Sequence, residues 1–381
     1  MKIAILTQPL HSNYGGILQA YALQTVLKRE GHDVITVNRL KGYPSFKQLL
    51  YRCGSFCKCV IRRYVKDDYR YVICNPFKKG DYLVHSEPDY DNSLVDDFVV
   101  NNIKLSVPIY STRNLRKFIK HNHIDCIVVG SDQVWREVYS PWITNYFLDF
   151  LDKESNIKRY AYAASFGVED NAISMHNVEK CSKLLRLFDA ISVREHSAKN
   201  YLKRTFGCDK EVPIVLDPTL LLPATAYFSL IKQEDISDSG VVSYILDNDS
   251  EKDFIVSDVA KIIGKRQTRL TTKPMETRRL VSVSKWLSSI AYADFVVTDS
   301  FHGCVFSIIF KKKFIAIGNK VRGLDRFHTL LSSFDLSNRL VLSKDEYLKK
   351  ANKLMEEIDY DKVAELYDQL RGLSLNFIKD I

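Results

Sequence analysis

Short, almost uninterrupted apolar runs alternate with helical segments along most of this 381-residue chain. Runs such as "DCIVVG", "DFVVTD" and "KFIAIG" carry apolar side chains at successive positions. A strand of this kind must be covered on both faces, which is the situation of strands in a parallel sheet between two layers of helices. The sequence therefore predicts an α/β fold.

The alternation comes in two series, which predicts two doubly wound, Rossmann-like domains in tandem. The first series runs from "KIAILTQ" to "VPIVLDPTLLL", and the second begins near "GVVSYILD". We place the boundary between Pro218 and Pro223, with an N-terminal domain at residues 1–219 and a C-terminal domain at residues 220–381. Both have the size of ordinary domains, and the last helices could pack back on the N-terminal domain.

The N-terminus does not resemble a signal peptide, and no apolar run reaches the ~18 residues that cross a bilayer. A cytoplasmic location is therefore expected. In that reducing compartment the eight cysteines should be free thiols, mostly buried. Cys53, Cys57, Cys59 and Cys74 match no zinc or iron–sulfur spacing, so no metal is predicted.

The net charge of +9 is concentrated in one stretch of the chain, residues 39–79. This stretch holds eleven Lys or Arg residues and two Asp residues, with aromatic residues between them. Such a mixture suits an anionic membrane surface or a polyphosphate headgroup, and it would also suit RNA. The alternative is a solvated helical insertion whose aromatic side chains pack on the domain beneath.

Loops that follow the predicted strands are the places to look for a ligand, because doubly wound sheets bind ligands beyond the carboxyl ends of their strands. The relevant loops read "TQPLHSNYGG", "GSDQVW", "ASFG", "SVRE" and "TDSFHG". Their small residues let the backbone approach a ligand, and their polar side chains can bind it. The predicted substrate-binding residues in these loops and the turns beside them are Asn13, Tyr14, Gly15, Gly16, Gln19, Ser131, Gln133, Ser165, Phe166, Asp299, Ser300, Phe301 and Gly303.

His302 stands where a buried strand turns into a buried helix. The free N–H groups and the positive dipole end of a helix start favour an anion. An imidazole can give or take a proton near neutral pH. We therefore expect His302 to meet an anionic substrate and move a proton, with a structural histidine that holds the turn as the alternative.

Arg194 and Asp132 follow two other strands. The Arg194 guanidinium could hold a carboxylate or phosphate at two points, and a salt bridge to Glu195 or Asp189 is the alternative. Asp132 lies near Gln133 and Trp135, a combination that suits hydrogen bonding to a sugar and stacking on it. The alternative for Asp132 is a helix N-cap.

Six segments in order resemble the polysaccharide pyruvyl transferase family, from near residue 1 to about Arg339. They read "NYGGILQAYALQ", "VVGSDQVW", "YAASFG", "ISVREHSAKNYL", "VLDPTLLL" and "ADFVVTDSFHGCVFSIIFKKKFIAI". The resemblance implies a fold like that of the two-domain GT-B glycosyltransferases, with the active site in the interdomain cleft. It also implies transfer of a pyruvyl group from phosphoenolpyruvate to two hydroxyls of a sugar, which forms a cyclic ketal and releases phosphate.

The resemblance also implies roles for individual residues. His302 would protonate the methylene carbon of phosphoenolpyruvate, and Arg194, which matches one of the family's arginines, would hold its carboxylate or phosphate. Ser300 stands where the better-described branch of the family has a second arginine, so Arg322 and Arg326 are candidates to supply the missing charge. Asp132 could be the base that activates a sugar hydroxyl.

The expected partners follow from the same resemblance. The C-terminal domain would bind phosphoenolpyruvate as a co-substrate, with no cofactor, and the N-terminal domain would bind the acceptor. The acceptor would belong to a cell-surface polysaccharide or to its polyprenyl-diphosphate-linked precursor. From the charge and aromatic content of residues 39–79 we expect contact with an anionic membrane surface, and no nucleic acid is expected as a partner. A GT-B glycosyltransferase that uses a nucleotide sugar, and a non-catalytic module that binds glycans or lipids, are the alternatives.

Overall fold

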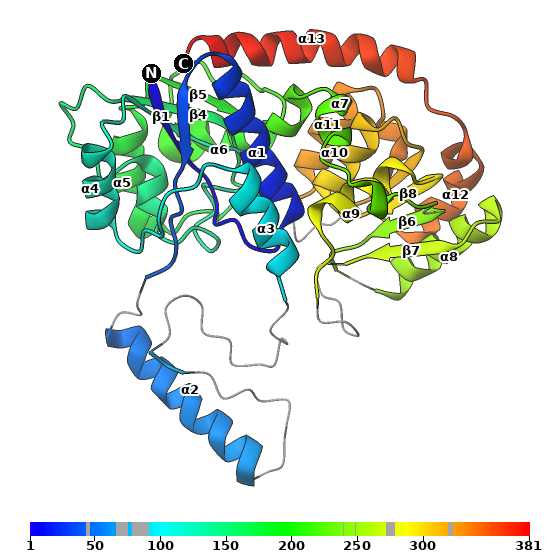
Figure 1. Cartoon of the computed structure of the whole chain (residues 1–381), viewed down its shortest axis with the longest axis horizontal. Helices are drawn as coiled ribbons and strands as arrows, with labels where there is room; N and C mark the ends of the chain where they lie inside the picture. The colour runs from blue at the N-terminus through cyan, green and yellow to red at the C-terminus, as the bar shows by residue number, and fades with distance from the viewer. Residues whose placement is uncertain are drawn as a thin grey trace.

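Two five-stranded sheets form the centres of two domains in the computed structural model (Figure 1). The structure describes residues 1–42, 46–65, 75–77, 91–238, 240–247, 249–271, 279–318 and 323–381. The N-terminal sheet consists of β1 (Lys2–Leu6), β2 (Asp33–Thr36), β3 (Cys126–Val129), β4 (Lys158–Ala164) and β5 (Ala190–Val193). The C-terminal sheet consists of β6 (Val241–Tyr244), β7 (Gln267–Leu270), β8 (Phe295–Thr298), β9 (Phe314–Ile317) and β10 (Leu340–Val341).

The two sheets have the same topology. Their strand orders are β2-β1-β3-β4-β5 and β7-β6-β8-β9-β10, and every pairing in them is parallel. In each sheet the connections reverse direction at one switch point, which lies between β1 and β3 in the first sheet and between β6 and β8 in the second. The predicted pair of doubly wound Rossmann-like domains is confirmed.

Helices cover both faces of the sheets, as strands that are apolar at successive positions require. Ile3 and Ile5 of β1 belong to one buried apolar cluster, and Ala4 and Leu6 belong to another. The helices of the N-terminal domain are α1 (Tyr14–Arg29), α2 (Phe46–Val65), α3 (Ser93–Asn102), α4 (Thr112–His121), α5 (Met175–Leu185) and α6 (His196–Phe206). Those that follow are α7 (Ala224–Phe228), α8 (Ser250–Ile263), α9 (Val283–Ala291), α10 (Phe301–Ile309), α11 (Asp325–Ser333), α12 (Lys344–Met355) and α13 (Tyr360–Lys379).

One apolar core continues from one domain into the other. It includes Ile3 and Tyr14 from the N-terminal domain and Trp286 from the C-terminal domain. The Tyr14 ring stacks on Trp286 with centroids 5.4 Å apart, and its hydroxyl donates a hydrogen bond to the carbonyl of Val281 at 2.8 Å. This shared core holds the two sheets in one arrangement.

The C-terminal helix α13 extends across both domains and ends beside the N-terminal strand (Figure 1). Near its start, the Tyr360 hydroxyl donates to the carbonyl of Lys312 in the C-terminal domain at 2.5 Å. Toward its end, Ser374 Oγ accepts a hydrogen bond from the backbone N–H of Leu216 at 3.0 Å, and Tyr160 of β4 donates to the carbonyl of Asp380 at 3.0 Å. The helix therefore links the two domains on the side opposite to α2.

Helix α2 is set apart from the two domains (Figure 1). It is the described part of the basic stretch at residues 39–79, together with residues 39–42 and 75–77. No helix in the described ranges combines the length and the apolar character needed to cross a membrane.

Candidate active site

The first turns of α1 and α10 meet at the boundary between the domains. Gly15 lies in the first turn of α1, and a Cβ atom on this residue would be 2.1 Å from His302 Nδ1. No side chain can tolerate that contact, so Gly15 lets the imidazole reach α1. The two helices follow β1 and β8, which border the switch points of the two sheets. This is the position where folds of this kind bind ligands.

His302 is the second residue of α10, and 6% of its surface is exposed. Its Nε2 atom lies 3.7 Å from Asp217 Oδ2, which is too long for a good hydrogen bond. Within the described residues this nitrogen has no hydrogen-bond partner. The ring is thus held beside a carboxylate, with its Nε2 atom buried.

Arg194 follows β5 directly and lies at the centre of a buried ionic cluster. Its side chain is 1% exposed and pairs with Asp132 at 3.2 Å, Asp217 at 2.9 Å and Glu195 at 3.4 Å. Burial lowers the pKa of the Arg194 guanidinium, but the three carboxylates outweigh burial and raise it. Arg194 is therefore a fixed cation whose charge is already more than matched by anions.

The salt bridge considered as the alternative role of Arg194 is present, because Glu195 pairs with it. Asp189 does not, since its carboxylate accepts a hydrogen bond from the backbone N–H of Arg159 at 2.7 Å. The predicted role of Arg194 in holding the substrate stays a prediction, and its bonds show a second role as the counter-ion of the cluster.

Asp217 is the residue that sequence reasoning missed. Its Oδ2 atom accepts hydrogen bonds from Arg194 Nη1 and Ser131 Oγ, both at 2.9 Å, and its Oδ1 atom accepts one from Thr219 Oγ1 at 2.7 Å. Burial raises the pKa of Asp217, but His302 and Arg194 outweigh burial and hold it well below its usual range. The available signal was the carboxylate that follows the apolar run in "VLDPTLLL".

Asp132 connects the cluster to the surface. It takes a left-handed backbone conformation with φ of 74°, its Oδ1 atom pairs with Arg194, and its Oδ2 atom lies 3.5 Å from Asn13 Nδ2. A Cβ atom on Gly16 would lie 3.4 Å from that same Oδ2. Asn13 is exposed, so this end of the site opens toward solvent. No helix begins after Asp132, which makes the N-cap alternative wrong.

In the loop "TDSFHG" the structure gives three predicted substrate-binding residues roles within the fold. The Asp299 carboxylate accepts hydrogen bonds from the backbone N–H of Leu246 at 2.6 Å and from Lys252 Nζ at 3.0 Å. Ser300 caps α10 by accepting from the N–H of Gly303 at 3.4 Å. A Cβ atom on Gly303 would lie 2.2 Å from Thr298 Oγ1.

Two arginines of the site, Arg194 and Arg326, both lie near the ring of Phe301. The guanidinium carbon of Arg194 lies 4.6 Å from the centre of the Phe301 ring, and that of Arg326 lies 5.8 Å from it. Arg326 belongs to α11, is 7% exposed and lies near the cluster through Phe301. Its predicted role as a supplementary charge stays a prediction. Arg322, the other candidate, lies outside the described residues.

Glu195 is the second acidic group that was not predicted as a site residue. It is 1% exposed, and neither of its carboxylate oxygens has a hydrogen-bond partner in the described part of the chain. Burial raises the pKa of Glu195 despite the opposing pull of Arg194 and Arg326. The described cluster thus holds three carboxylates against two guanidinium groups.

Several residues predicted to contact the substrate use their side chains in packing or in internal hydrogen bonds within the fold. Tyr14 stacks on Trp286, and Gln19 donates to Thr7 Oγ1 at 2.9 Å. Both are 0% exposed. Gln133 accepts a hydrogen bond from Arg136 Nη1 at 2.9 Å.

The side chains of Ser165 and Phe166 in the loop "ASFG" and of Trp135 are also used in packing. Ser165, Phe166 and Trp135 are all 0% exposed. The Trp135 and Phe166 rings pack 5.3 Å apart in the apolar core, so Trp135 offers no surface for stacking on a sugar. Gly167 lies against the C-terminal domain, where a Cβ atom on Gly323 would be 2.0 Å from its carbonyl oxygen.

Similarity to solved structures is confined to the fold. UDP-N-acetylglucosamine 2-epimerase from Rickettsia bellii is 10% identical, with a TM-score of 0.52 over 99% of this chain and 95% of that chain. UDP-GlcNAc 2-epimerase from Neisseria meningitidis bound to UDP-GlcNAc is 11% identical, with a TM-score of 0.50 over 99% of both chains. The protein thus has a GT-B-like fold of two Rossmann-like domains, as predicted.

The family follows from the sequence match. The family model described as polysaccharide pyruvyl transferase matches residues 13–321. This range contains the meeting helix starts and every member of the buried ionic cluster except Arg326. The chain belongs to the polysaccharide pyruvyl transferase family, which confirms the resemblance seen in its motifs. No curated protein sequence matches it.

Proposed function

We propose that the protein transfers the pyruvyl group of phosphoenolpyruvate to two hydroxyls of one sugar, forming a cyclic ketal and releasing phosphate. The acceptor sugar belongs to a cell-surface polysaccharide or to its polyprenyl-diphosphate-linked precursor. Membership of the polysaccharide pyruvyl transferase family supports the reaction class. The observation that carries the proposal is His302, held at the start of α10 against the first turn of α1 with Nε2 unbonded among the described residues.

In the first step, His302 donates a proton to the methylene carbon of phosphoenolpyruvate. The double bond opens, and positive charge develops at the neighbouring carbon. A sugar hydroxyl attacks this carbon and loses its proton to a base. Loss of phosphate then regenerates the electrophilic carbon, and the second hydroxyl closes the ketal. The two hydroxyl protons balance the one gained by the methyl group and the one carried away by phosphate.

The Asp132 carboxylate is the proposed base for the hydroxyl. It reaches from the ionic cluster toward the exposed side chain of Asn13, where an acceptor can approach. Its Oδ1 atom is bound by Arg194, and its Oδ2 atom faces Asn13 and Gly16. This arrangement supports the N-terminal domain as the acceptor side.

Phosphoenolpyruvate carries up to three negative charges, and the described cluster already has more carboxylates than guanidinium groups. We therefore propose that the free backbone N–H groups at the starts of α1 and α10 donate most of the hydrogen bonds to this anion, because the dipole of each helix favours negative charge at that end. Arg326 adds a cation from the C-terminal domain. Arg194 keeps Asp132 and Asp217 in place, and a shift in its pairing would let it contact the donor.

Release of inorganic phosphate from phosphoenolpyruvate is the measurement that tests this function. Purified protein is incubated with phosphoenolpyruvate and a panel of galactosides, mannosides and N-acetylhexosaminides, and ketal formation is followed by mass spectrometry. We expect phosphate release that depends on one acceptor class. Release of a nucleoside diphosphate from a sugar nucleotide, with no turnover of phosphoenolpyruvate, would favour a glycosyltransferase instead.

A further inference from the structure

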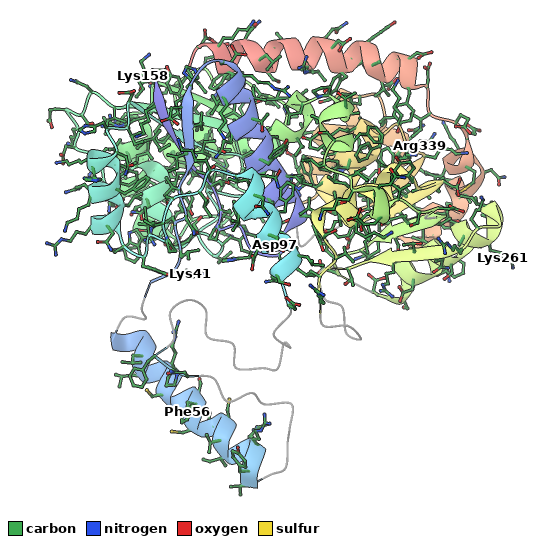
Figure 2. All side chains as sticks on the ribbon, in the orientation of Figure 1. Lys41, Phe56, Asp97, Lys158, Lys261 and Arg339 are labelled. Atoms are coloured by element: carbon green, nitrogen blue, oxygen red, sulfur yellow. The ribbon has the colours of Figure 1, made fainter. Side chains whose placement is uncertain are left out.

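Helix α2 exposes an apolar stripe. Leu50, Ile61 and Tyr64 are 59%, 50% and 70% exposed, and Cys57 is exposed between them. Spacings of seven, four and three residues place all four on one side of the helix. Figure 2 shows the side chains of α2, Phe56 among them, on a helix that stands apart from both domains.

The opposite side of α2 is the buried one. Arg52, Ser55 and Cys59 follow each other at spacings of three and four residues and are 9%, 8% and 0% exposed. Surface helices normally bury their apolar face and expose their polar face. In α2, however, Arg52 and Ser55 lie on the buried side, while Leu50, Ile61 and Tyr64 face outward.

The charge of α2 is entirely positive. Its sequence, "FKQLLYRCGSFCKCVIRRYV", contains five Lys or Arg residues and neither Asp nor Glu. Lys58 and Arg62 are exposed, and Arg63 is half-buried. The long stems of such side chains can lie along an apolar surface while their charged ends remain in water.

We infer that α2 binds the interfacial region of an anionic lipid bilayer, with its axis along the membrane surface. The apolar stripe enters the boundary between headgroups and acyl chains, where Tyr64 finds both apolar and polar surroundings. Lys58, Arg62 and Arg63 are attracted by anionic headgroups. The inference goes beyond the proposed function, because it concerns the location of the enzyme rather than the reaction.

Two features favour a bilayer over other partners. An RNA or another soluble polyanion would use the cations but would leave the apolar stripe in water. A second copy of the chain would cover the stripe but would bring two sets of cations together, at a cost in repulsion. An anionic bilayer offers both an apolar layer for the stripe and negative charge that attracts the cations of the helix.

Vesicle sedimentation tests the inference without any substrate, so its failure does not depend on the proposed function. The full-length protein is mixed with vesicles of phosphatidylglycerol and phosphatidylcholine, or of phosphatidylcholine alone. We expect binding to the anionic vesicles at ~0.05 M salt, at least about tenfold weaker binding to the neutral ones, and release at ~1 M salt.

Two variants of α2 separate charge from apolar contact. In one, Lys58→Glu, Arg62→Glu and Arg63→Glu reverse three cations, and in the other, Leu50→Gln, Ile61→Gln and Tyr64→Gln remove the stripe while keeping good helix formers. Each should lower the vesicle partition coefficient at least about tenfold. The matched control replaces three exposed basic residues of α4, as Arg113→Glu, Lys117→Glu and Lys120→Glu. This variant should alter the vesicle partition coefficient less than about threefold.

Other outcomes would overturn the inference. Equal binding to neutral and anionic vesicles, or an equal loss in the α4 variant, would mean that α2 is not the anionic-lipid contact. Binding that is insensitive to loss of the stripe would indicate a purely electrostatic contact, as with RNA. A dimer seen by light scattering that dissociates when the stripe is removed, with no vesicle binding, would identify a second copy as the partner.

Discussion

At the residue scale, the candidate site depends on one buried cation. Arg194 pairs with three carboxylates, and two of these, Asp132 and Asp217, face the proposed acceptor and His302, respectively. Removing one partner of a buried ion pair is costly because the remaining charge has lost its water and keeps no counter-charge. The same side chain can therefore be needed for folding and for catalysis, and experiments must separate the two.

Replacement of Arg194 tests its structural role. We expect Arg194→Ala to lower the free energy of unfolding by about 3–5 kcal/mol, because it leaves three buried carboxylates without their cation. Arg194→Lys should restore only part of this loss, since an ammonium cannot reproduce the guanidinium geometry. Denaturant unfolding measures both variants. Arg204→Ala, which breaks an exposed pair with Asp170, is the control and should cost less than about 1 kcal/mol. An Arg194→Ala loss as small as this control would contradict the role.

Replacement of His302 tests proton transfer. We expect His302→Asn to fold normally and to lose at least ~10²-fold in turnover at saturating phosphoenolpyruvate, the usual scale for a lost general acid. Phosphate release measures turnover, and the melting temperature checks folding. His176→Asn, at an exposed position on α5, should retain full turnover. Near wild-type turnover in the His302 variant would remove this residue from the mechanism.

At the element scale, the site is built where helix starts meet across the domain boundary. The starts of α1 and α10 face each other through Gly15 and His302. Nearby, α6 begins against α11, because Asp325 Oδ2 accepts a hydrogen bond from the backbone N–H of Ser197 at 2.7 Å. A residue of the C-terminal domain therefore satisfies one of the free N–H groups of an N-terminal-domain helix.

Asp325 provides a test of this contact between helices. We expect Asp325→Ala to lower the free energy of unfolding by about 0.5–2 kcal/mol, the usual range for loss of a helix cap. Asp345→Ala is the matched control, because Asp345 also lies in the first turn of a helix, α12, but at an exposed position. Unfolding of both variants in denaturant gives the comparison. Equal effects would mean that only the helix dipole, and not the cap across the boundary, contributes.

At the scale of the whole molecule, two buried carboxyl groups have opposite effects on how the free energy of unfolding depends on pH. The pKa of Asp217 is lowered in the folded protein, so its stabilisation is present above its ordinary value of ~3.9 and is lost as pH falls toward the lowered value. The pKa of Glu195 is raised, so its contribution is present below its ordinary value of ~4.3 and is lost as pH rises through the raised value.

The opposite directions of these two pKa shifts predict how stability changes with pH. We expect the free energy of unfolding to fall less steeply between about pH 4 and 3 in Asp217→Asn than in the native protein, because the carboxyl group with the lowered pKa has been removed. Glu195→Gln should lose less stability than the native protein as pH rises above ~4.3. Denaturant unfolding from pH 3 to 7 measures both slopes. Slopes unchanged by either replacement would show that these groups do not control the pH dependence.

The fold and the family were open to prediction from the sequence because their signals are local. A strand such as "DFVVTD" needs cover on both faces wherever it lies, and the repeated alternation of such strands with helices restricts the architecture to doubly wound sheets. The six family segments are also read along the chain. His302, Arg194 and Asp132 were found as candidates because each follows a strand, and the carboxyl ends of parallel strands meet at one edge of a sheet.

Only the tertiary structure decided which charged groups form ion pairs and which loop residues are buried. Nothing near Asp217 in the sequence shows that its carboxylate lies beside Arg194, 23 residues earlier, and beside His302 of the other domain. Phe166 and Tyr14 lie in loops and turns that bind ligands in such folds, yet the packing of neighbouring elements covers both. Burial and ion pairing depend on distances between segments that are far apart in the chain, whereas hydrophobic periodicity depends only on neighbouring residues.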